Sequence, residues 1–445
     1  MTEKKATVRA AFIAVTTLFF AWGFITSLID PLVASVKGIF TLSNVQAQLS
    51  AFAFFIAYGL ISFPAAALIA RLRPVPAILA ALSMMVLGCL VMLGAANLAV
   101  YTLVLLGLFV LASGITVLQV AANPLAAALG KPEGSHFRLT LSQTFNSFGT
   151  FVGPLVGAGL FLEGVEVTEG VTITPEVRDA ALGGIDRAYF WISGLLLLLL
   201  AFFFLSRRTV AAATPDPAPA KGLGALIADA FSSRWALLGG MAIFIYVGAE
   251  VAIGTQMALF LNSDATWGQS DAPFGVPLLG WVMGSDGVPG TSLQEAARAV
   301  SFYWGGAMVG RAIGTLLLAR FPAGRLMAIF AATAMLLCLY VFAVGGVSAG
   351  FVALSIGLFN SIMFPVIFTL TLERSTASEE ATSGMLCTAI IGGAFLPLLV
   401  GAVADSAGYA MAFIVPAACY AVLCGFAFTA ARTPPLRRAE GASVH

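Results

Sequence analysis

Two carboxylates lie inside apolar stretches of the sequence that are long enough to cross a membrane. Asp30 ends the segment Trp22–Asp30, and Glu250 ends the segment Tyr246–Glu250. A charged side chain at the depth of a bilayer is costly, so such groups usually face a cavity, pair with another group or carry protons. We therefore predict that both carboxylates are functional residues and that the protein is a membrane transporter.

The composition indicates a chain that resides in lipid. Hydrophobic residues make up 60% of it and charged residues 10%, whereas soluble domains are about half apolar and about a quarter charged. About twelve apolar runs of roughly 20 residues can be marked, each long enough to span the membrane as a helix. The predicted spans are 10–36, 45–70, 74–95, 98–129, 137–162, 187–206, 234–261, 296–319, 324–345, 349–372, 381–404 and 409–431. These runs are too long and too uniformly apolar for the strands of a membrane β-barrel.

A polar segment divides the chain into two halves of six spans. It carries Arg207 and Arg208 and then the Pro-rich run Thr214–Pro219, in which proline disfavours a continuing helix. We predict an N-terminal six-helix bundle over 1–206, a cytoplasmic linker over 207–233 and a C-terminal six-helix bundle over 234–445. The expected fold class is an all-α integral membrane protein with twelve transmembrane helices, the plan of the major facilitator fold, with a central site between the bundles.

The positions of the 22 Lys and Arg residues predict the orientation. Most of them fall in segments on one side of the predicted spans, and the opposite side carries only Lys37, Arg178, Arg187 and Arg298. The side rich in positive charge is normally the cytoplasmic one. We expect a multi-pass protein of the cytoplasmic (inner) membrane with both termini in the cytoplasm and a first span that is retained rather than cleaved.

Several classes of function are not expected. The net charge of +1 suggests no nucleic-acid partner, and the five cysteines lie in apolar runs as packing residues. The chain has two histidines, His136 and His445, and no nucleotide loop, nucleophile triad or metal cluster is evident. We therefore predict neither an enzyme nor a cofactor other than a coupling ion, and a protein that functions as a monomer.

Paired amides lie inside two spans of the N-terminal half. Gln119 and Asn123 are four residues apart and share one helix face, and Gln143 and Asn146 are three apart on another. Amides both donate and accept hydrogen bonds, which suits the hydroxyl groups of a sugar. The alternative is that they join neighbouring helices, for about 1 kcal/mol each.

The C-terminal half adds four candidates. Gln256 and Asn360 lie inside spans, and Trp304 offers a large ring on which the apolar face of a sugar can stack. Arg311 precedes Arg320 by about nine residues, or roughly 14 Å of helix, and is therefore expected well inside the bilayer. We predict a structural or gating ion pair for Arg311, with a carboxylate or with helix-end carbonyls; direct contact with the solute is the alternative.

These segments resemble the fucose:proton symporter family of the major facilitator superfamily, and most of all its glucose/galactose transporter branch. The resemblance covers nearly all of the predicted spans. The segments that carry it are Phe20–Thr26 with Asp30, Leu118–Pro124, Gln143–Gly149, Tyr246–Val251, Tyr303–Arg311 and Phe359–Pro365.

The resemblance implies roles for particular residues. Asp30 would be the proton-coupling residue of the substrate site, Gln119 takes the place of a second carboxylate of the fucose transporter, and Glu250 would supply a second acid or hold hydroxyls. Sugar would lie between one set of side chains from each half. These are Gln119, Asn123, Gln143 and Asn146 on one side and Glu250, Gln256, Trp304 and Asn360 on the other.

The sequence also departs from the family pattern. The family commonly has Asn, His and Gln where this chain has Ile29, Ser35 and Ala51. These replacements make the N-terminal half of the cavity less polar, so the identity of the sugar stays open. We predict proton-coupled uptake of a hexose of the glucose, galactose or fucose type by alternating access; the alternatives are sodium coupling, or export of a less polar solute.

Overall fold

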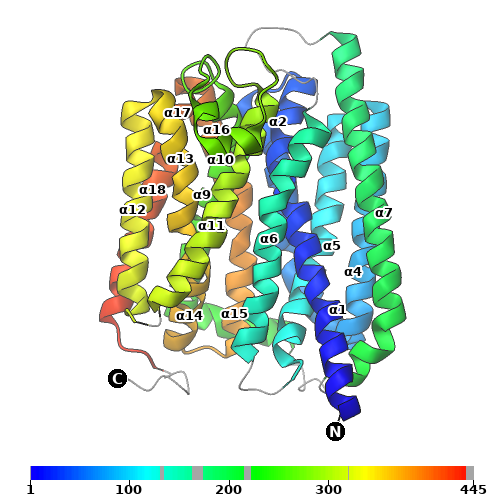
Figure 1. Ribbon diagram of the computed structural model, residues 1–445. Helices are drawn as coiled ribbons and strands as arrows, with labels where there is room; N and C mark the ends of the chain where they lie inside the picture. Colours follow the sequence, from blue (N-terminus) through cyan, green and yellow to red (C-terminus); the bar gives the residue numbers. More distant parts are fainter. Residues whose placement is uncertain (1, 131–134, 163–173, 215–221, 319, 437–445) are drawn as a thin grey trace.

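A bundle of long helices makes up the protein (Figure 1). The computed structural model describes residues 2–130, 135–162, 174–214, 222–318 and 320–436. The first helices are α1 (Thr2–Ser27), α2 (Ile29–Ile39), α3 (Asn44–Leu72), α4 (Pro74–Leu98), α5 (Tyr101–Ala128), α6 (Ser135–Phe161), α7 (Pro175–Ala213) and α8 (Leu223–Ser232). They are followed by α9 (Arg234–Asn262), α10 (Pro277–Met283), α11 (Leu293–Leu318), α12 (Ala323–Val344), α13 (Gly346–Asn360), α14 (Met363–Arg374), α15 (Glu379–Thr388), α16 (Gly392–Ala407), α17 (Tyr409–Ala412) and α18 (Ile414–Arg432). Short 3₁₀ turns, η2 (Ala272–Gly275) and η3 (Ala389–Ile391), complete the described elements.

The helices are long and apolar enough for a multi-pass membrane protein. Among the described residues, 10 helical stretches meet the length and hydropathy of a membrane span. Two more long helices, α6 and α11, are less apolar because they carry amides and charges such as Gln143, Asn146 and Arg311. The prediction of an all-α membrane protein is therefore confirmed.

Four predicted spans are each divided into separate helices. Those over 381–404 and 409–431 break at η3 and at Phe413. The span predicted over 10–36 breaks between α1 and α2 at Leu28, three residues before Pro31. The span predicted over 349–372 breaks between α13 and α14, just before Pro365. Proline has no N–H to donate, so the carbonyl four residues earlier loses its helical partner and the helix turns there. The breaks at Leu28 and before Pro365 thus each leave a buried backbone carbonyl without a helical partner.

The segment between the halves is more helical than expected. α7 continues past residue 206 to Ala213, and α8 occupies Leu223–Ser232 within the predicted linker 207–233. The Pro-rich run itself lies almost entirely outside the described residues. Both described ends of this segment are therefore helical where its polar composition predicts a linker.

Two sets of helices lie side by side. We call α1–α7 the N-terminal helices and α9–α18 the C-terminal helices. Within the first set α4 packs on α5 and α7, and α1 packs on α6; within the second, α12 packs on α13 and α18, and α9 on α16. The two sets meet mainly through α3 with α16, α6 with α11, and α2 with α9.

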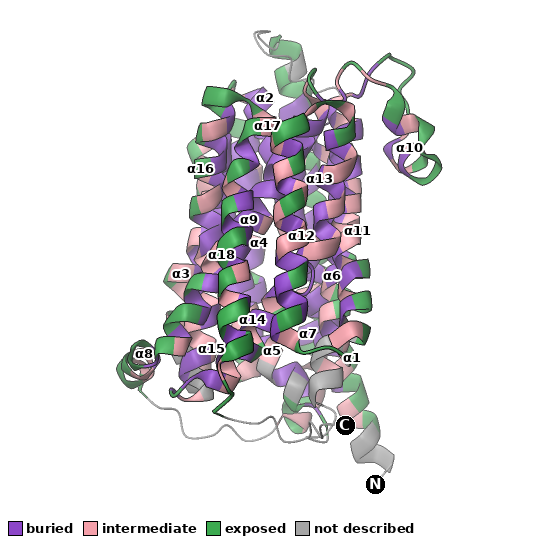
Figure 2. Cartoon of the chain, turned by 90° about the vertical axis from the view of Figure 1, so that its left-hand side faces the viewer, coloured by how far each residue is buried: buried purple, intermediate pink, exposed green. Residues whose placement is uncertain are grey.

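The molecule has two distinct ends. α1 begins and α18 ends at the same end, which we call the near end, while α2, α16 and α17 lie at the opposite, far end (Figures 1 and 2). Residues on the helix faces that turn away from the bundle are exposed, and those between the helices are buried (Figure 2). This pattern leaves the buried polar residues between the two sets as candidates for function.

Candidate functional site

Asp30 lies in the first turn of α2, directly after the break at Leu28. Its side chain is only 3% exposed. The indole Nε1 of Trp304 on α11 donates a hydrogen bond to Asp30 Oδ2 at 2.6 Å. This bond joins the N-terminal and the C-terminal helices in the interior of the protein.

A small cavity lies beside this bond. It is lined by Thr26, Ser27, Ile29, Asp30, Phe55, Thr150, Val251 and Trp304. The centres of water molecules can occupy about 30 Å³ of it, so the cavity is small. The lining combines hydroxyl groups, one carboxylate and one indole with apolar side chains from both sets of helices.

Glu250 lies on α9 and joins a chain of hydrogen bonds. Its Oε1 accepts a bond from the hydroxyl of Tyr246 at 2.6 Å, and its backbone carbonyl accepts one from Tyr303 at 3.0 Å. Asn360 Nδ2 donates to the same Tyr303 hydroxyl at 2.7 Å. Val251, the residue after Glu250 on α9, lines the Asp30 cavity. Glu250 and Asn360 therefore belong to one network beside the Asp30 cavity.

Arg311 supports the break between α13 and α14. Its Nε donates to the backbone carbonyl of Ser361 at 3.4 Å, which is the carbonyl that Pro365 leaves without a helical partner. Its guanidinium also donates to the hydroxyl of Ser147 on α6. Arg311 thus links both sets of helices.

The amides of the N-terminal half lie apart from the cavity and pair with their own set of helices. Gln119 Nε2 donates to the Tyr58 hydroxyl at 2.8 Å, and Gln143 Nε2 donates to Asn123 Oδ1 at 3.2 Å. Asn146 Nδ2 donates to the backbone carbonyl of Phe19 at 3.2 Å. Interhelical hydrogen bonding is thus the arrangement present in the structure, and contact with sugar needs these amides to exchange partners.

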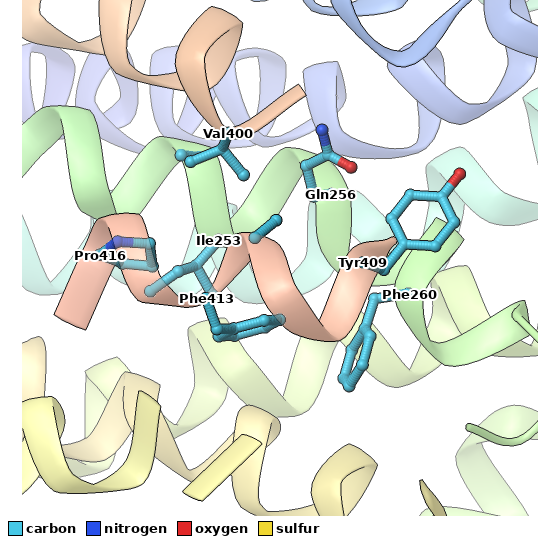
Figure 3. A pocket seen from close by; sticks show the side chains of 9 residues that line it. Ile253, Gln256, Phe260, Val400, Tyr409, Phe413 and Pro416 are labelled. Atoms are coloured by element: carbon cyan, nitrogen blue, oxygen red, sulfur yellow. The ribbon is translucent and has the colours of Figure 1, made fainter. Parts of the chain in front are cut away.

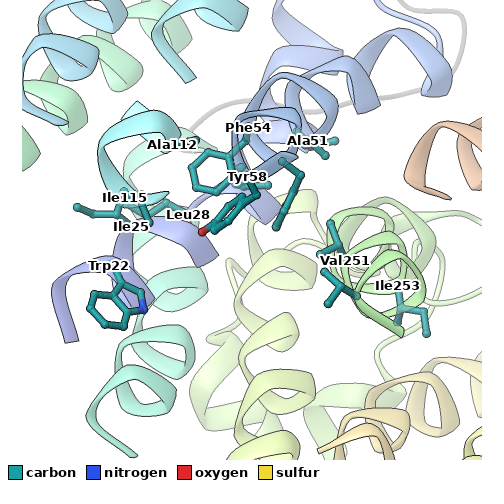
Figure 4. Packing of buried hydrophobic residues seen from close by; sticks show 14 of the residues in the cluster. Trp22, Ile25, Leu28, Ala51, Phe54, Tyr58, Ala112, Ile115, Val251 and Ile253 are labelled. Carbon is teal, nitrogen blue, oxygen red and sulfur yellow. The ribbon is translucent and has the colours of Figure 1, made fainter. Parts of the chain in front are cut away.

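The three departures from the family pattern have different surroundings. Ile29 lines the Asp30 cavity. Ser35 is fully buried away from it and donates to the carbonyl of Phe161 at 2.9 Å. Ala51 is fully buried in the apolar packing around Phe54 (Figure 4). Only the change at Ile29 therefore alters the polarity of this cavity directly.

Gln256 lies in a second cavity, two helical turns from Glu250. Its lining is mostly apolar and includes Phe260, Val400, Tyr409 and Phe413 (Figure 3). Neither polar atom of the Gln256 amide has a hydrogen-bond partner among the described residues. The structure thus separates Gln256 from the Asp30 site.

Several residues of the site were not predicted. Tyr246 lies one turn before Glu250, a spacing at which side chains on a helix meet, so the sequence did carry a signal for it. Tyr58 and Tyr303 carried no comparable signal, because their partners Gln119 and Asn360 are far away in the chain. Tyrosine hydroxyls inside spans are therefore candidates for function on the same grounds as amides.

The comparisons with known proteins agree with this architecture. The sequence profile described as Major Facilitator Superfamily matches residues 11–379. The chain is 39% identical to the glucose/galactose transporter of Brucella abortus, over 93% of this chain and 92% of the relative. It is 30% identical to the L-fucose-proton symporter of Escherichia coli, over 94% and 92%.

A solved structure supports the same assignment. The crystal structure of the transporter FucP in the outward conformation superposes with a TM-score of 0.67 at 29% identity, covering 96% of this chain and 100% of that one. A family of transporters also agrees with the prediction that the chain is not an enzyme. The chain belongs to the Major Facilitator Superfamily and, within it, to the fucose:proton symporter family.

Proposed function

We propose that this protein is a secondary active sugar transporter that couples hexose uptake to the entry of protons. The observation that carries the proposal is the hydrogen bond between Asp30 and Trp304, which holds a buried carboxylate between the two sets of helices. The names of its relatives support the solute and the ion: one is a glucose/galactose transporter and another an L-fucose-proton symporter.

The proton would act on the Asp30–Trp304 bond. An ionised carboxylate accepts a stronger hydrogen bond from an indole N–H than a protonated one does. Protonation of Asp30 would therefore weaken a link between the N-terminal and C-terminal helices, and it would remove a charge whose burial is costly. Both effects favour movement of the two sets only when the proton is bound.

Sugar would bind where the two sets meet. The hydroxyls of Thr26, Ser27 and Thr150 line the cavity, and the network of Glu250 and Asn360 lies beside it. The cavity is small, with about 30 Å³ open to the centres of water molecules, so the helices would move apart to admit a hexose. The amides Gln119, Asn123, Gln143 and Asn146 would then exchange their present partners for sugar hydroxyls, and the Trp304 ring would pack against the apolar face of the sugar.

The arrangement in the membrane follows the same proposal. With α6 and α11 as spans beside the ten apolar stretches, the chain crosses the membrane twelve times, in an N-terminal bundle over 1–206 and a C-terminal bundle over 234–445. The two bundles would rock about the central site and expose it to each side in turn. The near end would face the cytoplasm of a cell with this protein in its inner membrane, because most Lys and Arg residues lie toward that end.

The experiment that tests the proposal is uptake into proteoliposomes. A labelled panel of glucose, galactose, fucose, mannose and N-acetylglucosamine is offered with an inward proton gradient, with a sodium gradient and with neither. We expect accumulation of at least one hexose under the proton gradient. Accumulation only with sodium would show that sodium, and not the proton, is the coupling ion. The absence of uptake for every sugar under every gradient would reject sugar as the solute.

A further inference from the structure

An aspartate of the C-terminal helices caps a helix of the N-terminal set at the far end of the molecule. Asp405, near the end of α16, accepts hydrogen bonds from the backbone N–H groups of Asn44 and Val45 at 2.7 and 3.0 Å. These are the first two residues of α3. Helix N-termini leave N–H groups without helical partners and carry partial positive charge, so a carboxylate from another element is held there by both effects.

A second set of bonds crosses the same interface. The hydroxyl of Tyr409 on α17 accepts a hydrogen bond from Lys37 Nζ at 2.6 Å and donates to Asn44 Oδ1 at 2.9 Å. The Lys37 ammonium also lies 5.3 Å from the centre of the Tyr409 ring. Lys37 and Asn44 belong to the N-terminal helices, so Tyr409 and Asp405 hold the same region from the other set.

The backbones approach closely at this point. A Cβ atom added to Gly401 of α16 would lie 3.1 Å from the carbonyl of Asn44 and 3.2 Å from the Cα of Val45. Glycine therefore lets α16 come near enough for Asp405, one turn later, to reach the start of α3. The sequence places the smallest residue where the two sets make contact.

The interface below these bonds contains amides that are not fully paired. Gln48 on α3 accepts a hydrogen bond from the hydroxyl of Thr255 on α9 at 3.0 Å. The Gln48 Nε2 atom and both polar atoms of Gln256 have no hydrogen-bond partner among the described residues, although Gln48 and Gln256 are buried. A closed interface with unpaired amides is disfavoured, so it needs the bonds of Asp405 and Tyr409 to hold it.

We propose that Asp405 with the start of α3, and Tyr409 with Lys37, form a latch that closes the far end of the sugar path and must break to admit sugar from outside. Its placement on the outside depends on the proposed orientation in the membrane. The latch itself depends on the contacts at the far end, and it can be tested without any sugar.

The test measures whether a buried position of the full-length protein becomes accessible when the latch is weakened. The reporter is Gln48→Cys, at a site that is fully buried, labelled in sealed right-side-out vesicles with a maleimide that does not cross the membrane. We expect Asp405→Asn, which removes the charge and one acceptor, to raise the labelling rate several-fold over the reporter alone. The protein without the reporter gives the background from the native cysteines.

The matched control is Asp186→Asn. Asp186 Oδ1 accepts a hydrogen bond from Asn97 Nδ2 at 2.7 Å, but both residues belong to the N-terminal helices, so this change should leave the labelling rate unaltered. A second test is Gly401→Val, which separates α16 from α3 without a change in charge and should also raise the rate. Size-exclusion profiles of each variant identify those that do not fold.

Two outcomes contradict the proposal, and a third separates it from the proposed function. Equal labelling in Asp405→Asn, Gly401→Val and Asp186→Asn would show that no latch exists. Faster labelling from the cytoplasmic side alone would leave the contacts in place but reject their position outside. Faster labelling from outside in a protein that transports no sugar would support the latch and reject the proposed solute.

Discussion

At the scale of single residues, Asp30 is the group on which the proposed coupling depends. The change Asp30→Asn keeps the shape of the side chain and removes the titratable proton. We expect this variant to lose accumulation of sugar against a gradient while it retains exchange of sugar between the two sides, because a neutral side chain resembles the protonated state permanently. The measurement is counterflow and gradient-driven uptake in the same proteoliposomes; accumulation equal to that of the parent would exclude Asp30 as the coupling residue.

Trp304 is expected to contribute to proton coupling through the hydrogen bond that its indole Nε1 donates to Asp30. In Trp304→Phe the ring remains for packing and the donor to Asp30 Oδ2 is lost. Hydrogen bonds to charged groups contribute about 1.5–3 kcal/mol, and this one holds the two sets of helices together while Asp30 is ionised. Its loss lets them move without a proton, so we expect the accumulation of sugar at a given proton gradient to fall about tenfold or more. Tyr303→Phe is a useful comparison, since it removes a hydroxyl from the Glu250 and Asn360 network and leaves the Asp30 bond unchanged. Equal pH profiles of uptake for the parent and Trp304→Phe would contradict the role given to this bond.

Gln256 is a residue whose replacement should stabilise the folded protein. A buried amide without partners costs about 1–3 kcal/mol, and leucine is an apolar residue of similar size. We expect Gln256→Leu to raise the thermal unfolding temperature of the purified protein and to slow uptake from outside, because the arrangement with the far end closed becomes more stable. An unfolding temperature below that of the parent would mean that the amide is satisfied in the membrane.

At the scale of helices, the close contact of α1 with α6 sets the position of Asp30. A Cβ atom added to Gly149 of α6 would lie 2.7 Å from the backbone nitrogen of Phe24 on α1, and small residues allow membrane helices to pack this closely. We expect Gly149→Val to destabilise the protein by about 1–3 kcal/mol or more, as overpacking does.

Gly159 provides a control on the same helix. A Cβ atom there would have nothing within 4 Å, so Gly159→Val should leave the unfolding temperature close to that of the parent. Thermal unfolding of both variants in the same detergent makes the comparison. Equal losses of stability at the two positions would attribute the effect to β-branching in a helix rather than to the α1–α6 contact.

The sequence predicted the positions of most helices because long apolar runs have few alternatives in lipid. It predicted four spans as continuous that the structure divides. Two of them break at Leu28 and before Pro365, since proline inside a membrane span is tolerated in some contexts and turns the helix in others. The partner of Asp30 could not be predicted either. Trp304 is 274 residues away in the chain, and only the packing of the two sets brings them together.

The candidate site was predicted by residue type and only partly by location. Buried carboxylates and amides stand out in an apolar sequence, which is why Asp30, Glu250 and Asn360 were found. The placement of Gln256 depends on which face of α9 turns toward α16 and α17, and a nearly uniform apolar helix gives no periodic signal for that.

At the scale of the whole molecule, the two sets of helices should assemble even when they are not covalently joined. α7 ends at Ala213 and α8 begins at Leu223, and the sets contact one another through α3 with α16, α6 with α11 and α2 with α9. We expect fragments 1–214 and 222–445, expressed together, to restore uptake, and each fragment alone to give none. Failure of the pair to copurify would show that the connecting segment is needed for assembly.

The short helix α2 carries Asp30 in its first turn and Lys37 in its last, so one rigid element touches both the proton site and the far-end interface. Thermodynamic reciprocity then applies: whatever factor proton binding at Asp30 contributes to opening of that interface, opening contributes the same factor to proton binding. The pH at which uptake is half-maximal should therefore differ between the parent and Asp405→Asn, although Asp405 lies at the surface and never carries the transported proton. A substitution at Asp405 would thus change the proton affinity of Asp30, although the two residues are not in contact.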